Sequence, residues 1–186
     1  MKFLAVLLFA FLFAGALRAA DEPFEFSGVD GKKYTPLVVG DRKAVVLVFV
    51  SPYCPTSNNF TPEVNHIAAD YGDRFAFYFV EADGDISLAD AQKHIDTLEI
   101  TAPVLLDPAH RLALLTKAKT TPEAVVLARN GDPLYQGRIN DLYTTQTKKL
   151  KEPKTHDLRA ALDAIAAGQP VAVPNTKAIG CSISGI

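Results

Sequence analysis

The spacing of apolar side chains changes at one point in the first third of the chain. Residues 44–50 (AVVLVFV) are apolar without interruption, which is typical of a strand buried on both faces of a sheet. Beyond Pro55 the apolar positions are 60, 64, 67, 68 and 71, which lie on one face of a helix. We therefore expect a buried strand that leads directly into an amphipathic helix, which Gly72 is placed to end.

The rest of the chain continues this alternation of strand-like and helix-like segments. The turn dipeptides Asp30-Gly31 and Asn130-Gly131 each predict a hairpin, the first between short strands at 24–26 and 34–39. Strands joined by helices pair in parallel and hairpins add antiparallel strands, so the order predicts an α/β sandwich with a central mixed sheet. The other strands are expected over 75–81, 103–106, 123–129 and 133–139, and the other helices over 88–98, 108–117 and 156–167.

The first twenty residues have the pattern of a secretory signal peptide. Lys2 precedes an unbroken apolar run over residues 3–13, and small residues follow it. Arg18 ends the run short of the roughly 20 residues that a transmembrane helix needs, although an uncleaved membrane anchor is the alternative. We expect residues 1–20 to direct export to the periplasm or the extracellular space, 21–168 to form one domain, and 169–186 to form a C-terminal tail.

Charge and residue spacing exclude several classes of protein. The net charge is −2 at pH 7, and no cluster of Lys and Arg suggests a nucleic-acid partner. The four histidines share no metal-ligand spacing, and there is no glycine-rich phosphate loop, so we expect neither a metal nor an organic cofactor. In an exported protein the two cysteines, Cys54 and Cys181, form either a structural bridge or a redox pair.

Cys54 lies where the buried strand meets the helix. The free N–H groups and the dipole of a helix N-terminus favour negative charge, which lowers the pKa of a thiol placed there. Pro55 suits the first helical position because it lacks the N–H that would be unpaired. Cys54 is therefore a candidate nucleophile, with a buried, unreactive thiol as the alternative. Asn58, one turn into the helix, is expected either to hydrogen-bond near Cys54 or to cap the local backbone.

Four short segments of the chain, taken in order, form a recognisable set: Cys54 to Asn58, Thr121 to Ala124, Gly137 to Ile139, and Gly180-Cys181. They resemble the thioredoxin superfamily, and more narrowly its redoxin branch, the alkyl hydroperoxide reductase/thiol-specific antioxidant family. The resemblance covers about residues 24–183 and is strongest to exported bacterial redoxin-domain proteins. It implies a three-layer thioredoxin-like sandwich and a thiol-dependent oxidoreductase that needs no cofactor.

The resemblance carries over to single residues, with departures. Cys54 matches the family nucleophile, and Pro122, after Thr121, matches the cis-proline that lies against the active cysteine and leaves backbone free for a substrate strand. Ser57 stands where thioredoxins have their second cysteine, so no disulfide forms within the motif. Ser51, three residues before Cys54, could take the part of the peroxidase hydroxyl. The peroxidase arginine has no counterpart in the segment 120–122, which weighs against efficient peroxide chemistry.

Cys181 leaves two classes of function open. It could resolve an oxidised Cys54, form a permanent bridge with it, or stay unpaired. If Cys181 resolves an oxidised Cys54, we expect Gly180 and Gly185 to make the tail mobile enough for Cys181 to reach Cys54. The main hypothesis is an oxidoreductase that attacks a protein disulfide or a peroxide and is reset by an external reductant. The alternative is a non-catalytic binding module with a structural Cys54–Cys181 disulfide.

Overall fold

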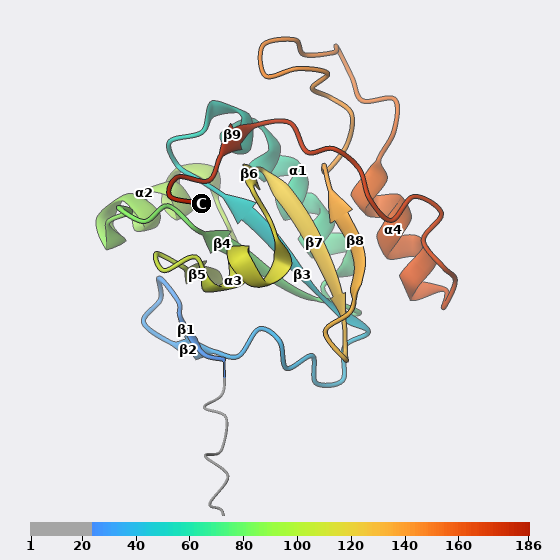
Figure 1. Cartoon of the computed structure of the whole chain (residues 1–186), viewed down its shortest axis with the longest axis horizontal. Coiled ribbons are helices and arrows are strands. Elements are labelled where there is room, and N and C mark those ends of the chain that lie inside the picture. Colours follow the sequence, from blue (N-terminus) through green and yellow to red (C-terminus); the bar gives the residue numbers. More distant parts are fainter. Residues whose placement is uncertain (1–23) are drawn as a thin grey trace, which may run out of the picture.

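A five-stranded mixed sheet forms the centre of the structure, a computed structural model that describes residues 24–186 (Figure 1). The expected signal peptide, residues 1–20, lies outside the described residues. The strand order is β5-β4-β3-β7-β8; β3 pairs in parallel with β4 and antiparallel with β7, which confirms the predicted mixed sheet. The strands are β3 (Ala44–Val50), β4 (Ala76–Glu81), β5 (Val104–Leu106), β7 (Glu123–Ala128) and β8 (Pro133–Gly137).

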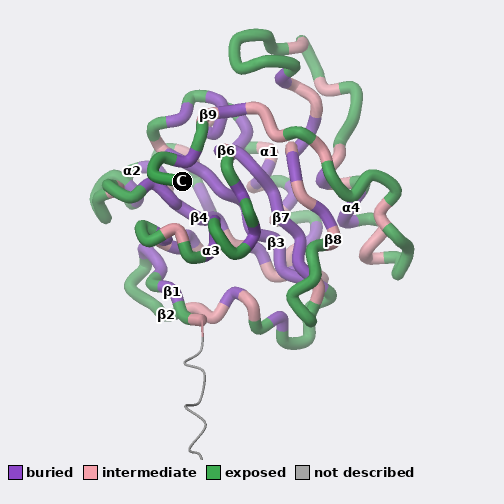
Figure 2. Tube along the Cα trace, in the orientation of Figure 1, coloured by how far each residue is buried: buried purple, intermediate pink, exposed green. Residues whose placement is uncertain are grey.

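The apolar run of β3 is buried along its whole length, as its sequence predicts (Figure 2). Successive side chains of a strand point to opposite faces of the sheet. Val46 and Val48 accordingly belong to one hydrophobic cluster, and Leu47 and Phe49 belong to a second. The core is therefore divided by the sheet into two apolar layers.

Helices cover both apolar layers. The cluster that contains Val46 also takes side chains from α1 (Pro55–Tyr71), α2 (Leu88–Leu98) and α4 (Asp157–Ala166). The cluster that contains Leu47 takes side chains from α3 (Arg111–Thr116) and from the front hairpin. This arrangement is the predicted three-layer α/β sandwich. Within residues 24–186, no helix is long and apolar enough to cross a membrane.

The front hairpin is shorter than its sequence predicts. It consists of β1 (Phe26–Ser27) and β2 (Lys33–Tyr34), so the expectation that the second strand continues to Val39 is wrong. The chain turns after β2, where the Val38 N–H donates to the Thr35 carbonyl at 2.9 Å. The apolar residues beyond the turn therefore pack as a loop.

Helix α3 begins three residues later than its sequence predicts, at Arg111 instead of Pro108. Asp107 still caps it, because its carboxylate accepts hydrogen bonds from the N–H groups of Arg111, Leu112 and Ala113 at 2.7–3.1 Å. His110 precedes the helix with a φ of 56°, so the chain makes a separate turn between the proline and the helix.

Two very short strands were not expected from the sequence. β6 (Thr120–Thr121) and β9 (Cys181–Ser182) pair antiparallel, with Thr121 opposite Cys181 and Thr120 opposite Ser182. The C-terminal tail, residues 169–186, thus returns from α4 across the molecule to the start of α1 (Figure 1). It brings the second cysteine to the end of the sheet at which the first one lies.

Candidate active site

The site is built where β3 ends and α1 begins. Cys54 is the N-cap residue of α1, and Pro55 occupies the first helical turn, as the sequence predicts. The Ser57 N–H points at the Cys54 Sγ, 3.4 Å from the nitrogen. A backbone donor and the positive end of a helix dipole therefore face the sulfur, an arrangement that stabilises a thiolate. Cys54 is only 1% exposed.

The loop before β7 forms the opposite wall of the site. The Thr121–Pro122 peptide bond is cis, as the resemblance predicts. The Thr121 carbonyl oxygen lies 3.1 Å from the Cys54 Sγ, and Thr121 itself is buried. The cysteine is therefore enclosed between the start of α1 and the backbone that precedes the cis-proline.

Cys181 completes the site by forming a disulfide with Cys54. The two Cα atoms are 5.9 Å apart, although 127 positions separate them in the chain. Of the three alternatives that the sequence leaves open, the unpaired one is therefore wrong. Cys181 reaches the site as part of β9, whose pairing partner Thr121 also contacts the Cys54 sulfur.

Backbone contacts hold the tail on both sides of Cys181. The Ile183 N–H donates to the Lys119 carbonyl at 2.9 Å, and the Ile183 side chain is buried in the second hydrophobic cluster. On the other side, the Gln146 side chain donates to the Gly180 carbonyl. A Cβ atom built on Gly180 would overlap the Thr121 carbonyl. The lack of a side chain at Gly180 therefore lets two backbones come into contact, and the expected mobility of the tail stays a prediction.

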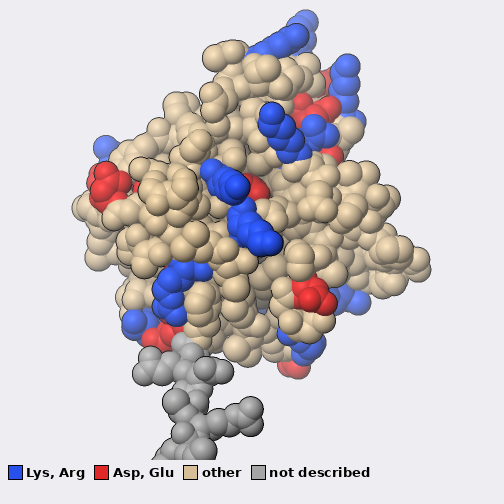
Figure 3. Space-filling model, in the orientation of Figure 1, with Lys and Arg blue, Asp and Glu red and all other residues tan. Residues whose placement is uncertain are grey.

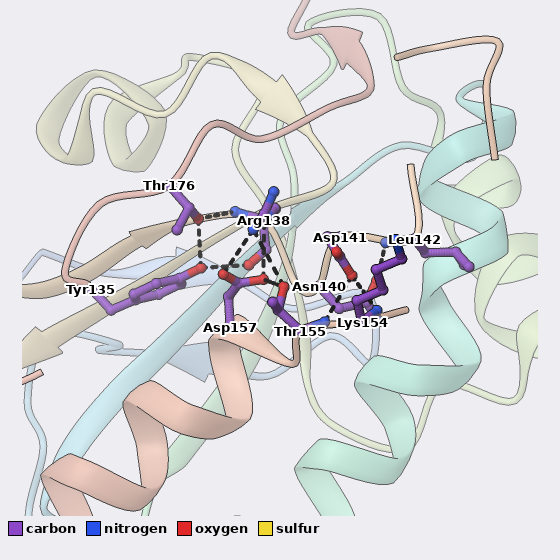
Figure 4. Close-up of polar contacts among 9 residues, drawn as sticks. All are labelled: Tyr135, Arg138, Asn140, Asp141, Leu142, Lys154, Thr155, Asp157 and Thr176. Carbon is purple, nitrogen blue, oxygen red and sulfur yellow. Dashed lines mark hydrogen bonds and ion pairs between the residues drawn. The ribbon is translucent and has the colours of Figure 1, made fainter. Parts of the chain in front are cut away.

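A second anchor fixes the tail before it reaches the site (Figure 4). The Thr176 hydroxyl accepts a hydrogen bond from the Arg138 N–H at 3.0 Å and lies 2.8 Å from the Tyr135 hydroxyl. Tyr135 donates its own proton to the Arg138 carbonyl at 2.6 Å, so Thr176 is the donor to Tyr135. Burial raises the pKa of Tyr135 to about 12, which keeps this phenol protonated. Arg138 also pairs with Asp157, at the start of α4.

Ser51 and Ser57 organise the turn that carries Cys54. The Ser51 hydroxyl accepts from the Tyr53 N–H at 3.2 Å, and the Ser57 hydroxyl accepts from the Ser51 N–H at the same distance. The Ser51 backbone carbonyl accepts from the Cys54 N–H. The Ser51 hydroxyl thus supports the backbone of the turn, and its expected part as a peroxidase hydroxyl stays a prediction.

Asn58 contacts His94, and through it Glu81, two residues that the sequence analysis missed. Its side-chain amide donates to the Pro52 carbonyl at 3.0 Å, and its oxygen lies 3.0 Å from His94 Nε2. His94 Nδ1 is 2.6 Å from Glu81 Oε1. A sequence signal was present for Glu81, the only charged residue in the segment 75–81, which is otherwise apolar. For His94 the sequence gave no comparable signal, although the structure buries its side chain on α2.

Charge around the site is moderate. The face drawn in Figure 3 carries basic and acidic side chains in small separate groups. In residues 24–186, no three His, Cys, Asp or Glu side chains are grouped as metal ligands would be.

We expect Gly180→Ala to slow formation of the Cys54–Cys181 disulfide about tenfold. The added methyl group would overlap the Thr121 carbonyl and push Cys181 out of its pairing with β6. The measurement is the rate of disulfide closure in reduced protein after addition of oxidised glutathione. Gly84→Ala is the matched control, because Gly84 has no positive φ and an added Cβ atom would make only ordinary contacts, the nearest at 3.6 Å. Equal closure rates in the Gly180 variant and the unchanged protein would contradict the close-contact role of Gly180.

Comparison with known proteins agrees with this geometry. Residues 41–132 match a family model described as thioredoxin-like. No functionally curated protein matches the sequence. A conserved protein of unknown function from Geobacillus kaustophilus superposes with a TM-score of 0.74 at 27% identity, covering 87% of this chain and 88% of its own.

Two solved structures with stated redox roles are similar in fold. The exposed lipoprotein thioredoxin of Streptococcus pneumoniae has a TM-score of 0.58 at 24% identity, covering 77% of this chain and 98% of its own. A secreted disulfide oxidoreductase of Mycobacterium tuberculosis has a TM-score of 0.57 at 16% identity, covering 78% and 96%. At these identities the two structures establish the fold alone. The family match over residues 41–132, the mixed sheet and the cis-proline opposite an N-capping cysteine together identify a thioredoxin-like domain in this chain.

Proposed function

We propose that this protein is a thiol–disulfide oxidoreductase in which Cys54 and Cys181 are the redox pair. One observation carries the proposal: the disulfide partner Cys54 caps the N-terminus of α1, opposite the cis-proline loop. A bridge that only fixed the tail would gain nothing from this placement, because thiolate stabilisation favours the reduced form. The similarity in fold to a secreted disulfide oxidoreductase and to a lipoprotein thioredoxin supports the same assignment.

The forward reaction begins from the reduced protein. The Cys54 thiolate attacks one sulfur of a partner disulfide, the partner S–S bond breaks, and the departing partner thiolate takes up a proton. Cys181, as thiolate, then attacks the Cys54 sulfur of the mixed disulfide and releases the second partner thiol. The partner gains two electrons and two protons, and the chain is left with the Cys54–Cys181 disulfide.

An external thiol reductant completes the cycle by attacking this disulfide. We propose that it attacks Cys181, which is half-buried, whereas Cys54 is 1% exposed. The Cys54 sulfur then leaves as a thiolate facing the Ser57 N–H, and a second reductant thiol releases Cys181. The roles are therefore unequal: Cys54 is the nucleophile and leaving group, and Cys181 is the resolving residue and the point of attack.

Peroxide is the second substrate class that we consider, which would make the protein an antioxidant. The Cys54 thiolate would be oxidised to a sulfenic acid, and Cys181 would condense with it to give the same disulfide and water. We rank peroxide below protein disulfides because the Thr121 carbonyl, an acceptor, lies 3.1 Å from the sulfur, where a peroxidase arginine would donate hydrogen bonds.

We propose that the reaction takes place outside the cytoplasm. Residues 1–20 have the signal-peptide pattern, residues 169–186 act as a tail that delivers the resolving cysteine, and a disulfide persists in an oxidising compartment. The secreted oxidoreductase and the exposed lipoprotein thioredoxin among the similar structures support this location. The partners are then exported proteins that carry thiols or disulfides, together with an external reductant.

The deciding experiment equilibrates the protein with glutathione buffers of increasing reducing strength and counts the free cysteines by mass after alkylation. We expect a two-electron transition within the range that glutathione and dithiothreitol span. Hydrogen peroxide added to the reduced protein tests the second substrate class in the same assay. A disulfide that stays closed throughout would instead identify a binding module with a structural bridge.

A further inference from the structure

Two buried polar side chains, those of Glu81 and His94, and the half-buried Asn58 form a hydrogen-bonded series behind the turn that carries Cys54. Glu81, at the end of β4, is fully buried, and His94 of α2 is 5% exposed. Asn58 of α1 joins them to the Pro52 carbonyl. The series therefore connects the core of the sheet to the residues immediately before the nucleophile.

The Pro52 carbonyl, at one end of this series of hydrogen bonds, dictates the direction of each bond in it. The Pro52 carbonyl can only accept, so the Asn58 amide nitrogen must face it, at 3.0 Å. The Asn58 oxygen therefore faces His94 and accepts from a protonated Nε2. His94 Nδ1 then meets Glu81 Oε1 at 2.6 Å with one proton between them. The tautomer of His94 is thus set by the same contact that orients the Asn58 amide.

Glu81 lies at the opposite end of the series from Pro52 and holds His94 by a hydrogen bond. Burial raises the pKa of its carboxyl, while the hydrogen bond to His94 opposes the rise. Its second oxygen, Oε2, has no hydrogen-bond partner, although it is buried. With one shared proton the Glu81–His94 pair is neutral overall, whereas loss of that proton would leave a buried charge facing the Nδ1 lone pair.

Three other charged side chains lie near these polar residues: those of Asp83, Asp90 and Lys93. Asp83 follows Glu81 and is buried, and Asp90 and Lys93 of α2 line a cavity of about 270 Å³ beside Asn58 and His94. Water in this cavity would compete for the Asn58 amide if His94 did not hold it. The buried bond to His94 therefore keeps the amide on the Pro52 carbonyl.

We propose that Glu81 and His94 are positioning residues for Cys54: they lock the Asn58 amide onto the Pro52 carbonyl and so fix the turn that aligns the sulfur with the N-terminus of α1. The inference rests on the proposed thiol chemistry and adds two residues to it. The physical link is short, because Pro52 precedes the N-cap by two residues and Asn58 donates its own backbone N–H to the Cys54 carbonyl at 3.0 Å.

The test measures the pKa of Cys54 in the full chain carrying Cys181→Ser, in which Cys54 is the sole thiol. Thiolate absorbance followed against pH gives the pKa, and the reaction with oxidised glutathione gives the exchange rate. We expect Asn58→Ala and His94→Ala each to raise this pKa by about one unit and to slow exchange several-fold near neutral pH, because the sulfur loses its alignment with the helix N-terminus. The Asn58→Ala/His94→Ala double variant should show no larger rise in the Cys54 pKa than either single variant, since both residues act through one contact.

Three further variants separate positioning from other roles. Asn59→Ala is the matched control, because Asn59 lies in the same turn of α1 but donates to Tyr143, at 2.8 Å. Glu81→Gln should retain the Cys54 pKa, since its amide can donate to Nδ1 and leave the Nε2 proton in place. Glu81→Leu/His94→Leu replaces the pair by apolar groups and should match Asn58→Ala, even where His94→Ala fails to fold with Glu81 unpaired.

An unchanged Cys54 pKa in the Asn58 variant and in the apolar double variant would overturn the proposal. A rise in the Cys54 pKa in Glu81→Gln as large as in His94→Ala would also overturn the proposal. The proton shared by Glu81 and His94, and not the orientation of the Asn58 amide, would then control the pKa. If the parent chain does not exchange with glutathione at all, the proposed function fails while the pKa comparison still decides the positioning role.

Discussion

Cys54→Ser will reduce thiol–disulfide exchange to the uncatalysed background. A serine hydroxyl does not ionise near neutral pH, so the Ser57 N–H and the helix N-terminus would have no thiolate to stabilise. Cys181 remains in this variant, but it lies in β9 and lacks the helix terminus that lowers a thiol pKa. The measurement is the rate of insulin disulfide reduction with dithiothreitol as the electron source, compared with dithiothreitol alone.

Cys181→Ser is the informative partner of this variant. Its Cys54 can still attack a disulfide, but no resolving thiol follows, so a mixed disulfide should accumulate and turnover should stop after one event. Mass mapping of Cys54 after reaction with oxidised glutathione detects that species. Turnover by the Cys54 variant at a rate near that of the unchanged protein would refute the assignment of the nucleophile.

The half of the site formed by β3 and α1 could be predicted from local sequence. An unbroken apolar run, a change to helical spacing and a proline at the first turn are short-range signals, and they place Cys54 at a helix N-terminus without knowledge of the fold. The cis bond at Pro122 followed from the family resemblance instead. The structure confirms both expectations, the first drawn from short-range signals and the second from the resemblance.

The other half of the site depends on contacts between distant segments, and the sequence carries little sign of them. β6 and β9 are two residues long, too short for any periodicity, and their pairing joins Thr121 to Cys181 and Thr120 to Ser182, far apart in the sequence. Gly180 gives no indication that its role is a contact with Thr121. The Glu81–His94 contact likewise joins a strand end to a separate helix.

The tail is held on the site by more than the disulfide. Ile183 and Thr176 anchor the tail on either side of Cys181, so breaking the disulfide does not by itself release it. The partner strand that a thioredoxin-like fold would take beside Thr121 must therefore displace β9. Reduced protein should keep most of its tail contacts until a partner competes for them.

Reduction of the Cys54–Cys181 disulfide will lower the free energy of unfolding by up to about 5 kcal/mol. This is the chain-entropy value for a loop closed across 127 positions, and it is comparable to the whole stability of many domains. Urea unfolding of the oxidised protein and of the protein in excess reductant measures the difference. The Cys54→Ser/Cys181→Ser variant is the control, because it cannot close the bridge and its stability should therefore not change when reductant is added.

The same experiment constrains the redox chemistry. By a thermodynamic cycle, the free energy by which the disulfide stabilises the fold equals that by which folding stabilises the disulfide, and about 1.4 kcal/mol corresponds to roughly 30 mV. Thiolate stabilisation at the N-terminus of α1 favours the reduced fold and so diminishes both quantities together. A stability difference well below the loop-closure value, with a potential that is less reducing by the matching amount, is therefore the result expected of a redox pair. The full loop-closure value with a strongly reducing potential would contradict it, because the helix terminus would then contribute nothing and the bridge would be structural.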